Sequence, residues 1–286
     1  MTTTPTTTPT DSGLLRFTKH HGAGNDFLVQ VDPTGRGPLP VELVRALCDR
    51  RFGLGADGVI RVQDGRGSAD VTMVLQNADG GEAEMSGNGM RCLAQAAVLS
   101  AMVFPPTFTV ATAAGVKSVD YHEGAQVYTA EATVGLGLAV LGDDQPQKFL
   151  DRKVREVDMG NPHLVMFGPD LDDVDIVGIG THLQTVYPEG INVEFIASGD
   201  EPDNLVLKVF ERGAGVTEAC GTGSAAAAAA AHSWGLVGTE VDVHNPGGTL
   251  HVSLGEDDIL LRGPVHRVAS VVVDPVAVMA GARSCT

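Results

Sequence analysis

The amino-acid sequence predicts an α+β protein with two pseudo-symmetric lobes, each a curved, mostly antiparallel sheet wrapped around one central helix. Many short extended segments alternate with one long helical segment in each half of the chain, a pattern typical of α+β folds. A second observation is an internal repeat, which brings similar segments back after about 134 residues. Third, each half contains a glycine-rich turn that runs directly into its long helix.

The length of 286 residues allows two units that each bury a core. We place a disordered Thr/Pro-rich tail at 1–13, the N-terminal lobe at 14–134 and the C-terminal lobe at 135–267. A returning strand at 268–276 is expected to pair with the N-terminal lobe.

Composition excludes several classes of partner. The net charge of −17 argues against binding to nucleic-acid phosphates, and no apolar run is long enough to span a membrane. The N-terminus lacks the apolar core of a secretory signal, so we expect a cytoplasmic protein. The four cysteines lack the spacing of a disulfide framework or a zinc site.

The N-terminal lobe begins with extended segments and contains two helices, at 41–51 and 91–102. Its strands are predicted at 15–19, 28–31, 59–62, 69–75, 108–112, 116–119 and 126–134. The segment 53–58 matches a dinucleotide-binding fingerprint in its glycines. It follows a helix and precedes a strand, which is the reverse of the order that a phosphate site needs, so we reject it.

The C-terminal lobe follows a polar loop at 142–147 and contains an alanine-rich helix at 224–234. Its strands are predicted at 154–159, 192–195, 205–210, 248–254, 259–262 and 268–273. The small alanine side chains suit close packing in a crowded centre.

The repeat aligns two stretches that end at the starts of the long helices. Ser86-Gly-Asn-Gly corresponds to Cys220-Gly-Thr-Gly, and Asn77 and Glu211 each precede them by nine residues. Unpaired N–H groups at a helix start lower the pKa of a thiol and can also hold a carboxylate. A buried structural cysteine is the alternative for Cys220, but the repetition of the layout favours a site where the two helix starts face each other.

Two facing helix starts can hold one substrate carboxylate from both sides. Groups at Ser86 and Cys220 would then flank the adjacent carbon, which is the geometry of two-base proton transfer with inversion. Preorganised N–H groups would stabilise the charge that builds up on the carboxylate. No lysine has a pyridoxal-phosphate context and no cluster has metal-ligand spacing, so we expect neither cofactor nor metal.

Nine motifs in this order resemble the diaminopimelate epimerase family across roughly residues 16–274. They are His21-Gly-Ala-Gly-Asn-Asp-Phe, Gly55-Ala-Asp-Gly, Asn77-Ala-Asp-Gly, Gly87-Asn-Gly-Met-Arg-Cys, Gly160-Asn-Pro-His-Leu, Gly190-Ile-Asn-Val-Glu-Phe, Glu211-Arg-Gly, Cys220-Gly-Thr-Gly and Pro246-Gly-Gly. The resemblance implies cofactor-independent interconversion of LL- and meso-diaminopimelate, toward lysine and peptidoglycan. It also implies the two-lobed fold shared with proline racemase and phenazine-biosynthesis isomerases.

The resemblance also implies the roles of individual residues. Cys220 would be a catalytic thiol, with His163 and Glu211 beside the reacting centre. The substrate's amino and carboxylate groups would be bound by Asn25, Asn77, Asn161, Asn192 and Arg212, and the N–H cradle would comprise Gly87, Asn88, Gly221 and Thr222. As partners we expect the small-molecule substrate and a second copy of the chain in a homodimer.

The chain departs from the family pattern at two positions. Ser86 stands where the family has its other cysteine, and a serine hydroxyl is a proton donor but hardly a base unless a neighbour activates it. Glu84, Asp79 and Glu211 are the candidate neighbours, while we expect Cys92 to lie in the core. Gly58 stands where the family has a glutamine, so that contact is absent or made by the backbone.

Two alternatives to diaminopimelate epimerase stay open. One is another cofactor-free amino-acid racemase or isomerase of the same fold. The other is an inactive paralogue that binds an amino acid, although the retained Cys220, Glu211 and His163 argue against it.

Overall fold

The computed structural model describes residues 13–35, 37–144 and 152–283. The predicted tail, apart from Gly13, lies outside these ranges, as do residues 145–147 of the predicted loop at 142–147 and Cys285. The loop prediction was wrong for residues 142–144, which are part of a strand that pairs with residues 155–158. Among the helices of the described ranges, none combines the length and apolar character needed to cross a membrane.

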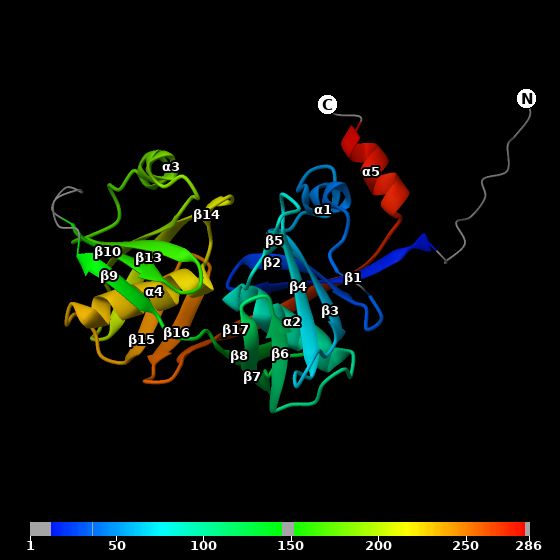
Figure 1. Ribbon diagram of the computed structural model, residues 1–286, viewed down its shortest axis with the longest axis horizontal. Coiled ribbons are helices and arrows are strands. Elements are labelled where there is room, and N and C mark those ends of the chain that lie inside the picture. Colours follow the sequence, from blue (N-terminus) through cyan, green and yellow to red (C-terminus); the bar gives the residue numbers. More distant parts are fainter. Residues whose placement is uncertain (1–12, 36, 145–151, 284–286) are drawn as a thin grey trace, which may run out of the picture.

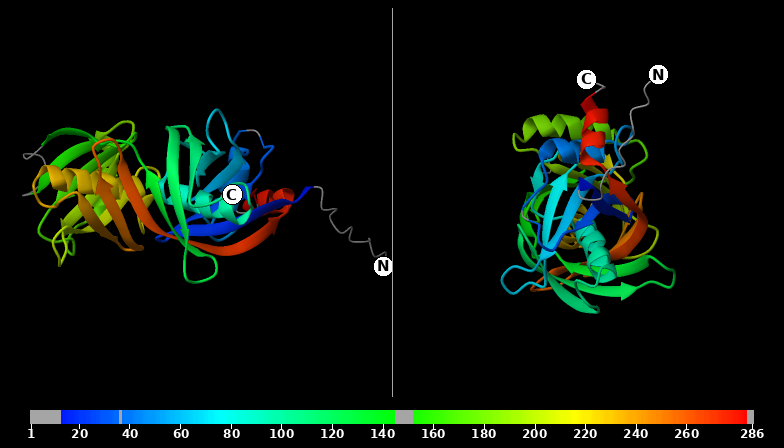
Figure 2. Two further views of the ribbon diagram at one scale, coloured as in Figure 1. Left: turned by 90° about the horizontal axis from the view of Figure 1, so that it is seen from below. Right: turned by 90° about the vertical axis from the view of Figure 1, so that its right-hand side faces the viewer.

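The chain forms two lobes side by side, each with a curved sheet around a central helix, which confirms the predicted fold class (Figure 1). The central helices are α2 (Gly87–Leu99) and α4 (Gly221–Ser233). The views in Figure 2 show an elongated molecule with the lobes at its two ends. α2 begins four residues earlier than predicted (87 instead of 91) and α4 three residues earlier (221 instead of 224), because each glycine-rich turn is already the first helical turn.

The strands of the N-terminal lobe are β1 (Leu15–Gly22), β2 (Asn25–Val31), β3 (Gly58–Asp64), β4 (Val71–Asn77), β5 (Glu82–Ala83), β6 (Thr107–Thr112), β7 (Gly115–Glu123) and β8 (Thr129–Gly135). Those of the C-terminal lobe are β9 (Val140–Asp144), β10 (Lys153–Asp158), β11 (Pro162–Phe167), β12 (Asn192–Ser198), β13 (Asn204–Glu211), β14 (Gly215–Thr217), β15 (Glu240–Asn245) and β16 (Gly248–Leu254). The last strand, β17 (Ile259–Val273), belongs to both lobes.

The same order of pairings occurs in both lobes, which confirms the internal repeat. A tight hairpin (β1–β2, β10–β11) is followed by a parallel pair (β2–β3, β11–β12) and then an antiparallel pair (β3–β4, β12–β13). Parallel neighbours need a crossover connection. The crossovers contain α1 (Val41–Cys48) and α3 (Ile176–Val186).

Strands β8 and β17 pair antiparallel where the lobes meet, from Thr129↔His266 to Gly135↔Leu260. Beyond this segment β17 continues along β1 and ends at the pair Leu15↔Val273, as the returning strand was expected to do. The prediction of two separate strands at 259–262 and 268–273 was wrong. Pro264 interrupts the sequence pattern, yet it is accommodated opposite Glu131 within one continuous strand.

Two helices were missed. α3 is rich in glycine and β-branched residues, which are weak helix formers, but Asp175 caps it by accepting a hydrogen bond from Gly178 N–H. α5 (Pro275–Arg283) follows β17 and packs on α1 (Figure 1). Its Val278 and Met279 pack against the apolar cluster that contains Leu43. Both helices owe their stability to tertiary packing.

Candidate active site

The N-termini of the two central helices meet in the middle of the molecule. Ser86 caps α2 and Cys220 caps α4, each accepting a hydrogen bond from the third residue of its helix, Gly89 N–H (3.0 Å) or Gly223 N–H (3.4 Å). A Cβ built on Gly221 would lie 3.1 Å from the Gly87 Cα, so only glycine allows the helix starts to approach this closely. The predicted facing arrangement is therefore present.

Four backbone N–H groups at these helix starts are free to bind a ligand. In the part of the chain that the structure describes, the N–H groups of Gly87, Asn88, Gly221 and Thr222 have no protein acceptor. All four residues line one cavity of about 430 Å³. Free N–H groups and the positive ends of two helix dipoles suit a carboxylate.

The same cavity collects the predicted site residues from both lobes, with one exception. Its walls include Asn25, Asn77, Ser86, Gly87, Asn88, Asn161, Asn192, Glu211, Arg212, Cys220, Gly221 and Thr222. His163 does not line it. Its fully buried ring lies behind the wall, where Nε2 contacts the Asn161 amide oxygen at 3.0 Å.

The Cys220 thiol is buried, and burial raises its pKa well above the ordinary value. The negative charges of Glu211 and Glu194 act in the same direction, while Thr222 and the Gly223 N–H lower the pKa by smaller amounts. The expectation that the pKa of this thiol is lowered at the helix start was therefore wrong. Desolvation outweighs the helix terminus because the cap supplies a single long N–H···S bond.

Glu211 lies beside Cys220 at the end of β13. Burial raises the pKa of its carboxyl group, and hydrogen bonds from Thr217 and Cys220 oppose this shift. A carboxylate with increased proton affinity in contact with a thiol is placed to accept the thiol proton.

Ser86 lies in a different environment from Cys220. Within the described residues its hydroxyl is hydrogen-bonded to Gly89 N–H alone. Asp79, Glu84 and Glu211 line the same cavity, but none of them contacts the Ser86 hydroxyl by a hydrogen bond. The structure thus brings no activating base to Ser86, and its hydroxyl hydrogen is free to be donated.

Asn25 and Asn88 tie the two lobes together at the cradle. The Asn88 amide nitrogen donates to Asn25 Oδ1 (3.2 Å) and to the carbonyl oxygen of Ala219 (2.9 Å), the residue before Cys220. Asp57 fixes the other end of Asn25, accepting from its Nδ2 at 2.7 Å, and is itself paired with Arg50. Asp57 and Arg50 were not predicted as site residues, although Asp57 lies within the quoted Gly55-Ala-Asp-Gly motif.

In the C-terminal lobe, the Asn192 side chain connects two segments that border the cavity. Its amide nitrogen donates to the Pro162 carbonyl (3.0 Å), and its Oδ1 accepts from Arg212 N–H (2.9 Å). The Arg212 and Asn77 side chains also border the cavity, and both are exposed. Gly58 lies at the position equivalent to Asn192, since it pairs with Phe27 across β2–β3 as Asn192 pairs with His163 across β11–β12, and it offers no side chain.

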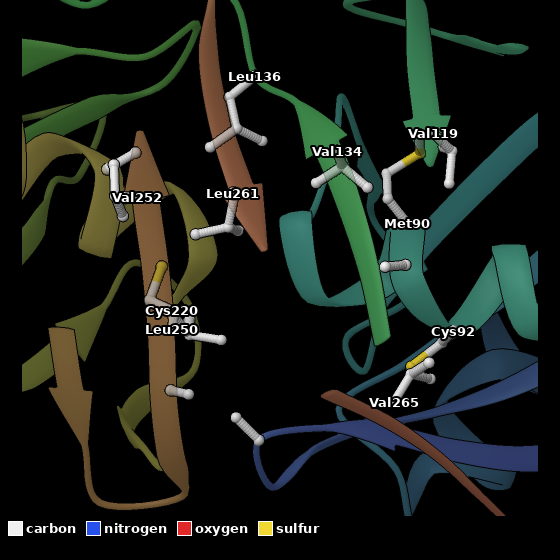
Figure 3. Packing of buried hydrophobic residues seen from close by; sticks show 14 of the residues in the cluster. Met90, Cys92, Val119, Val134, Leu136, Cys220, Leu250, Val252, Leu261 and Val265 are labelled. Atoms are coloured by element: carbon white, nitrogen blue, oxygen red, sulfur yellow. The ribbon is translucent and has the colours of Figure 1, made fainter. Parts of the chain in front are cut away.

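Three cysteines fall within the described ranges. Figure 3 shows Cys220 on the α4 side and Cys92 on the α2 side of the central apolar cluster. Cys92 is fully buried and burial raises its pKa to about 12, which confirms the expected core position. Cys48 is buried at the end of α1 and borders the cavity. Over residues 13–35, 37–144 and 152–283, no cluster of His, Cys, Asp or Glu could hold a metal ion.

Sequence reasoning assigned no role to Glu194, although it lies within the quoted Gly190-Ile-Asn-Val-Glu-Phe motif. It lies in the middle of β12, fully buried, with Oε1 2.7 Å from His163 Nδ1. A charged residue inside the otherwise apolar run of β12 was the available signal.

Comparison with known proteins agrees with the sequence motifs. The family profile described as "Diaminopimelate epimerase" matches residues 17–135 and 155–268. Proteins named diaminopimelate epimerase are 35% identical in Methanothermobacter thermautotrophicus (92% of this chain, 98% of that one) and 37% identical in Bacteroides thetaiotaomicron (89% and 96%). Another, from Synechococcus elongatus, is 38% identical (90% and 97%).

Solved structures of low sequence identity share the fold. A hydroxyproline epimerase from Agrobacterium vitis superimposes with a TM-score of 0.68 at 17% identity, covering 91% of each chain. A phenazine biosynthesis protein of the PhzF family from Bacillus anthracis gives a TM-score of 0.69 at 15% identity, covering 91% of this chain and 99% of that one. With the family profile and the relatives over 35% identical across nine-tenths of the sequence, the chain belongs to the diaminopimelate epimerase family.

Proposed function

We propose that this protein is a diaminopimelate epimerase, an isomerase that interconverts LL- and meso-2,6-diaminopimelate in the synthesis of lysine and peptidoglycan precursors. The observation that carries the proposal is the meeting of two helix N-termini, capped by Ser86 and Cys220, around four free N–H groups. Family membership supports the substrate, and the cavity supports the chemistry.

The α-carboxylate of the substrate binds to the N–H groups of Gly87, Asn88, Gly221 and Thr222. The α-carbon then lies between the Ser86 hydroxyl on one face and the Cys220 sulfur on the other. When the α-proton leaves, negative charge spreads onto the carboxylate, and the fixed N–H groups stabilise it without reorganisation. This step needs no external electron sink.

Because burial raises the pKa of Cys220, its thiol must lose a proton to a neighbouring group before the sulfur can act as a base. Glu211 takes this proton, since it contacts the thiol and burial increases its proton affinity. The Cys220 thiolate then removes the α-proton of the substrate. On the opposite face Ser86 gives its hydroxyl proton to the carbon, which inverts the configuration. Ser86 then regains a proton through cavity water while Glu211 releases the proton it took from Cys220, so the net proton count of the site is restored.

The second amino-acid centre of diaminopimelate occupies the outer part of the cavity. Arg212, Asn77, Asn161 and Asn192 line this region and exceed what a single α-amino acid needs. Arg212 provides the positive charge for the distal carboxylate. Alanine and proline, which lack this centre, are expected to be poor substrates.

Incubation with LL-diaminopimelate in D₂O tests the proposal. Formation of meso-diaminopimelate with deuterium at one α-carbon supports it. Exchange without inversion would indicate that proton transfer takes place only on the Cys220 face. Binding without exchange would indicate an inactive paralogue. Equal turnover of alanine or proline would instead favour another racemase of this fold.

A homodimer and a cytoplasmic location remain part of the proposal. Light scattering of the purified protein measures the first, and fractionation of cells that express the full chain measures the second.

A further inference from the structure

The internal repeat allows the surroundings of Ser86 and Cys220 to be compared position by position. Phe27 faces Gly58 across the parallel pair β2–β3, as His163 faces Asn192 across β11–β12. In the same registers Ile60 corresponds to Glu194. A Cβ on Gly89 would meet Ile60 Cδ1 at 3.2 Å, and a Cβ on Gly223 would meet Glu194 Oε1 at 2.6 Å.

The two equivalent positions therefore carry opposite chemistry. On the Ser86 side these positions hold two buried apolar side chains, Phe27, which lines the cavity, and Ile60. Behind Cys220 lie a buried histidine and a buried carboxylate, His163 and Glu194, both with fully inaccessible side chains. A buried pair of this kind is costly to keep, so it needs a reason beyond packing.

A chain of side-chain contacts connects the Glu194–His163 pair to Asn161 in the cavity wall. Glu194 Oε1 accepts from His163 Nδ1 at 2.7 Å, and His163 Nε2 contacts Asn161 Oδ1 at 3.0 Å. Both ring nitrogens thus face side-chain oxygens, and with a hydrogen on each nitrogen the ring would donate to both and supply the counter-charge of the buried carboxylate. The Asn161 Nδ2 group has no protein acceptor among the described residues, and Asn161 lines the cavity.

The corresponding asparagine of the N-terminal lobe is oriented by other means. Asn25 donates its Nδ2 to Asp57 and accepts from Asn88 at Oδ1, so both ends of its amide are engaged within the protein. Asn161 keeps its donor end for a ligand. The two lobes hold equivalent asparagines in different ways because one amide is structural and the other faces the substrate.

We propose that Glu194 and His163 are positioning residues that hold the Asn161 amide with its Nδ2 group toward the cavity, where it donates to a carboxylate of the substrate. His163 is accordingly not in the proton path between Cys220 and the α-carbon. This inference deepens the proposed function and rests on it for the identity of the substrate.

Two variants test the role of the Glu194–His163 pair, and a third variant serves as the control. Glu194→Gln keeps the shape but removes the carboxylate, so the ring keeps one hydrogen, and the new amide can either accept from Nδ1 or donate to it. The Asn161 amide is then no longer held in a single orientation. The double variant His163→Phe/Glu194→Ile copies the apolar pair of the N-terminal lobe and avoids leaving one buried partner alone. His20→Phe is the control, because it removes a buried, hydrogen-bonded histidine that does not line the cavity.

Calorimetric binding of LL-diaminopimelate and steady-state kinetics give the first readout. We expect the Kd and KM to rise about tenfold or more in Glu194→Gln and in the double variant, with kcat changed by less than about threefold, as for lost ground-state binding. The control should lower the melting temperature without changing Kd. An unchanged Kd in both test variants would overturn the proposal, as would a hundredfold fall in kcat with Kd retained, which would return His163 to the proton path.

Nitrogen-15 chemical shifts of the histidine rings give a second readout that does not depend on turnover. In the parent protein at neutral pH, the His163 signals, assigned by their absence from the double variant, should show both nitrogens protonated. In Glu194→Gln they should show one. A neutral His163 ring in the parent refutes the inference even if the enzyme is active, whereas a parent that shows the expected ring but neither binds nor turns over diaminopimelate refutes the proposed function.

Discussion

Replacing Gly221 with alanine should force the two helix starts apart. The added Cβ would lie 3.1 Å from Gly87 Cα, 3.4 Å from Asn88 N and 2.8 Å from Leu261 Cδ2. Carbon atoms rest at about 3.5–4.0 Å, so the backbones must separate by roughly 0.5 Å. Leu261 can rotate away, but the Gly87 backbone cannot move without moving the cradle.

This displacement should reduce activity more than stability. A misplacement of about 1 Å can cost about a hundredfold in rate, so roughly half of that distance should lower kcat by about tenfold. Overpacking destabilises by about 1–3 kcal/mol. Alanine is favoured over glycine in a helix by about 1 kcal/mol, so the net loss in the free energy of unfolding should be about 0–2 kcal/mol.

The assay is α-deuterium exchange of LL-diaminopimelate in D₂O, with the melting temperature measured in parallel. Leu261→Ala in the Gly221→Ala background relieves the side-chain contact but leaves the contact with Gly87. We expect no recovery of exchange in the double variant. A Gly221→Ala protein with parental exchange, or full recovery with Leu261→Ala, would refute the idea that the approach of the helix starts sets the rate.

The remaining predictions concern the two capping residues and the outer cavity. Because burial raises the pKa of Cys220, only a small fraction of its thiol is ionised at neutral pH. Iodoacetamide should therefore modify Cys220 at pH 7.5 at least about tenfold more slowly than it modifies free cysteine, and the rate should increase as the pH rises. Rapid modification at pH 7.5 would contradict this. Cys220→Ser should nearly abolish turnover, whereas Ser86→Ala should suppress inversion and leave some exchange on the Cys220 face. NMR measurement of α-deuterium exchange for each substrate isomer tests both expectations. A fully active Ser86→Ala protein would remove residue 86 from the proton path. Ser86→Cys should be tolerated and should make the enzyme sensitive to mild oxidant, while peptide mapping of the oxidised parent should find no bond between Cys220 and Cys92. Arg212→Ala should raise the KM for LL-diaminopimelate by about tenfold or more through loss of a charge-assisted hydrogen bond, and an unchanged KM would place the distal carboxylate elsewhere.

The sequence was sufficient to predict the two lobes because the repeat is carried by residues that the backbone requires. Glycines at positive φ, such as Gly24 and Gly160, mark equivalent hairpin turns, and the paired glycines after Ser86 and Cys220 allow the helix starts to meet. Those same constraints explain why the cavity-lining residues could be identified in advance. The contiguity of β17 was less visible, since Pro264 reads locally as a strand end although its neighbours pair on both sides.

The charge state of the site could not be read from the motif. A helix start lowers the pKa of an exposed thiol, but the burial of Cys220 and the proximity of Glu194 depend on how β12 packs against α4. The position of His163 behind Asn161 likewise depends on which face of β11 points inward. Such features arise from tertiary packing, and a sequence pattern constrains them weakly.

The shared strand β17 has a consequence for how the chain is made. Leu15, at the start of β1, pairs with Val273, at the end of β17. The first strand to leave the ribosome therefore cannot complete its pairing until the last strand has been synthesised. Until then β1 and β8 both present open edges, which are prone to pair with other chains. Contacts of such long sequence separation slow folding, and they make the N-terminal lobe dependent on completed synthesis. A chain cut short before β17 would therefore lose the architecture of its beginning as well as that of its end.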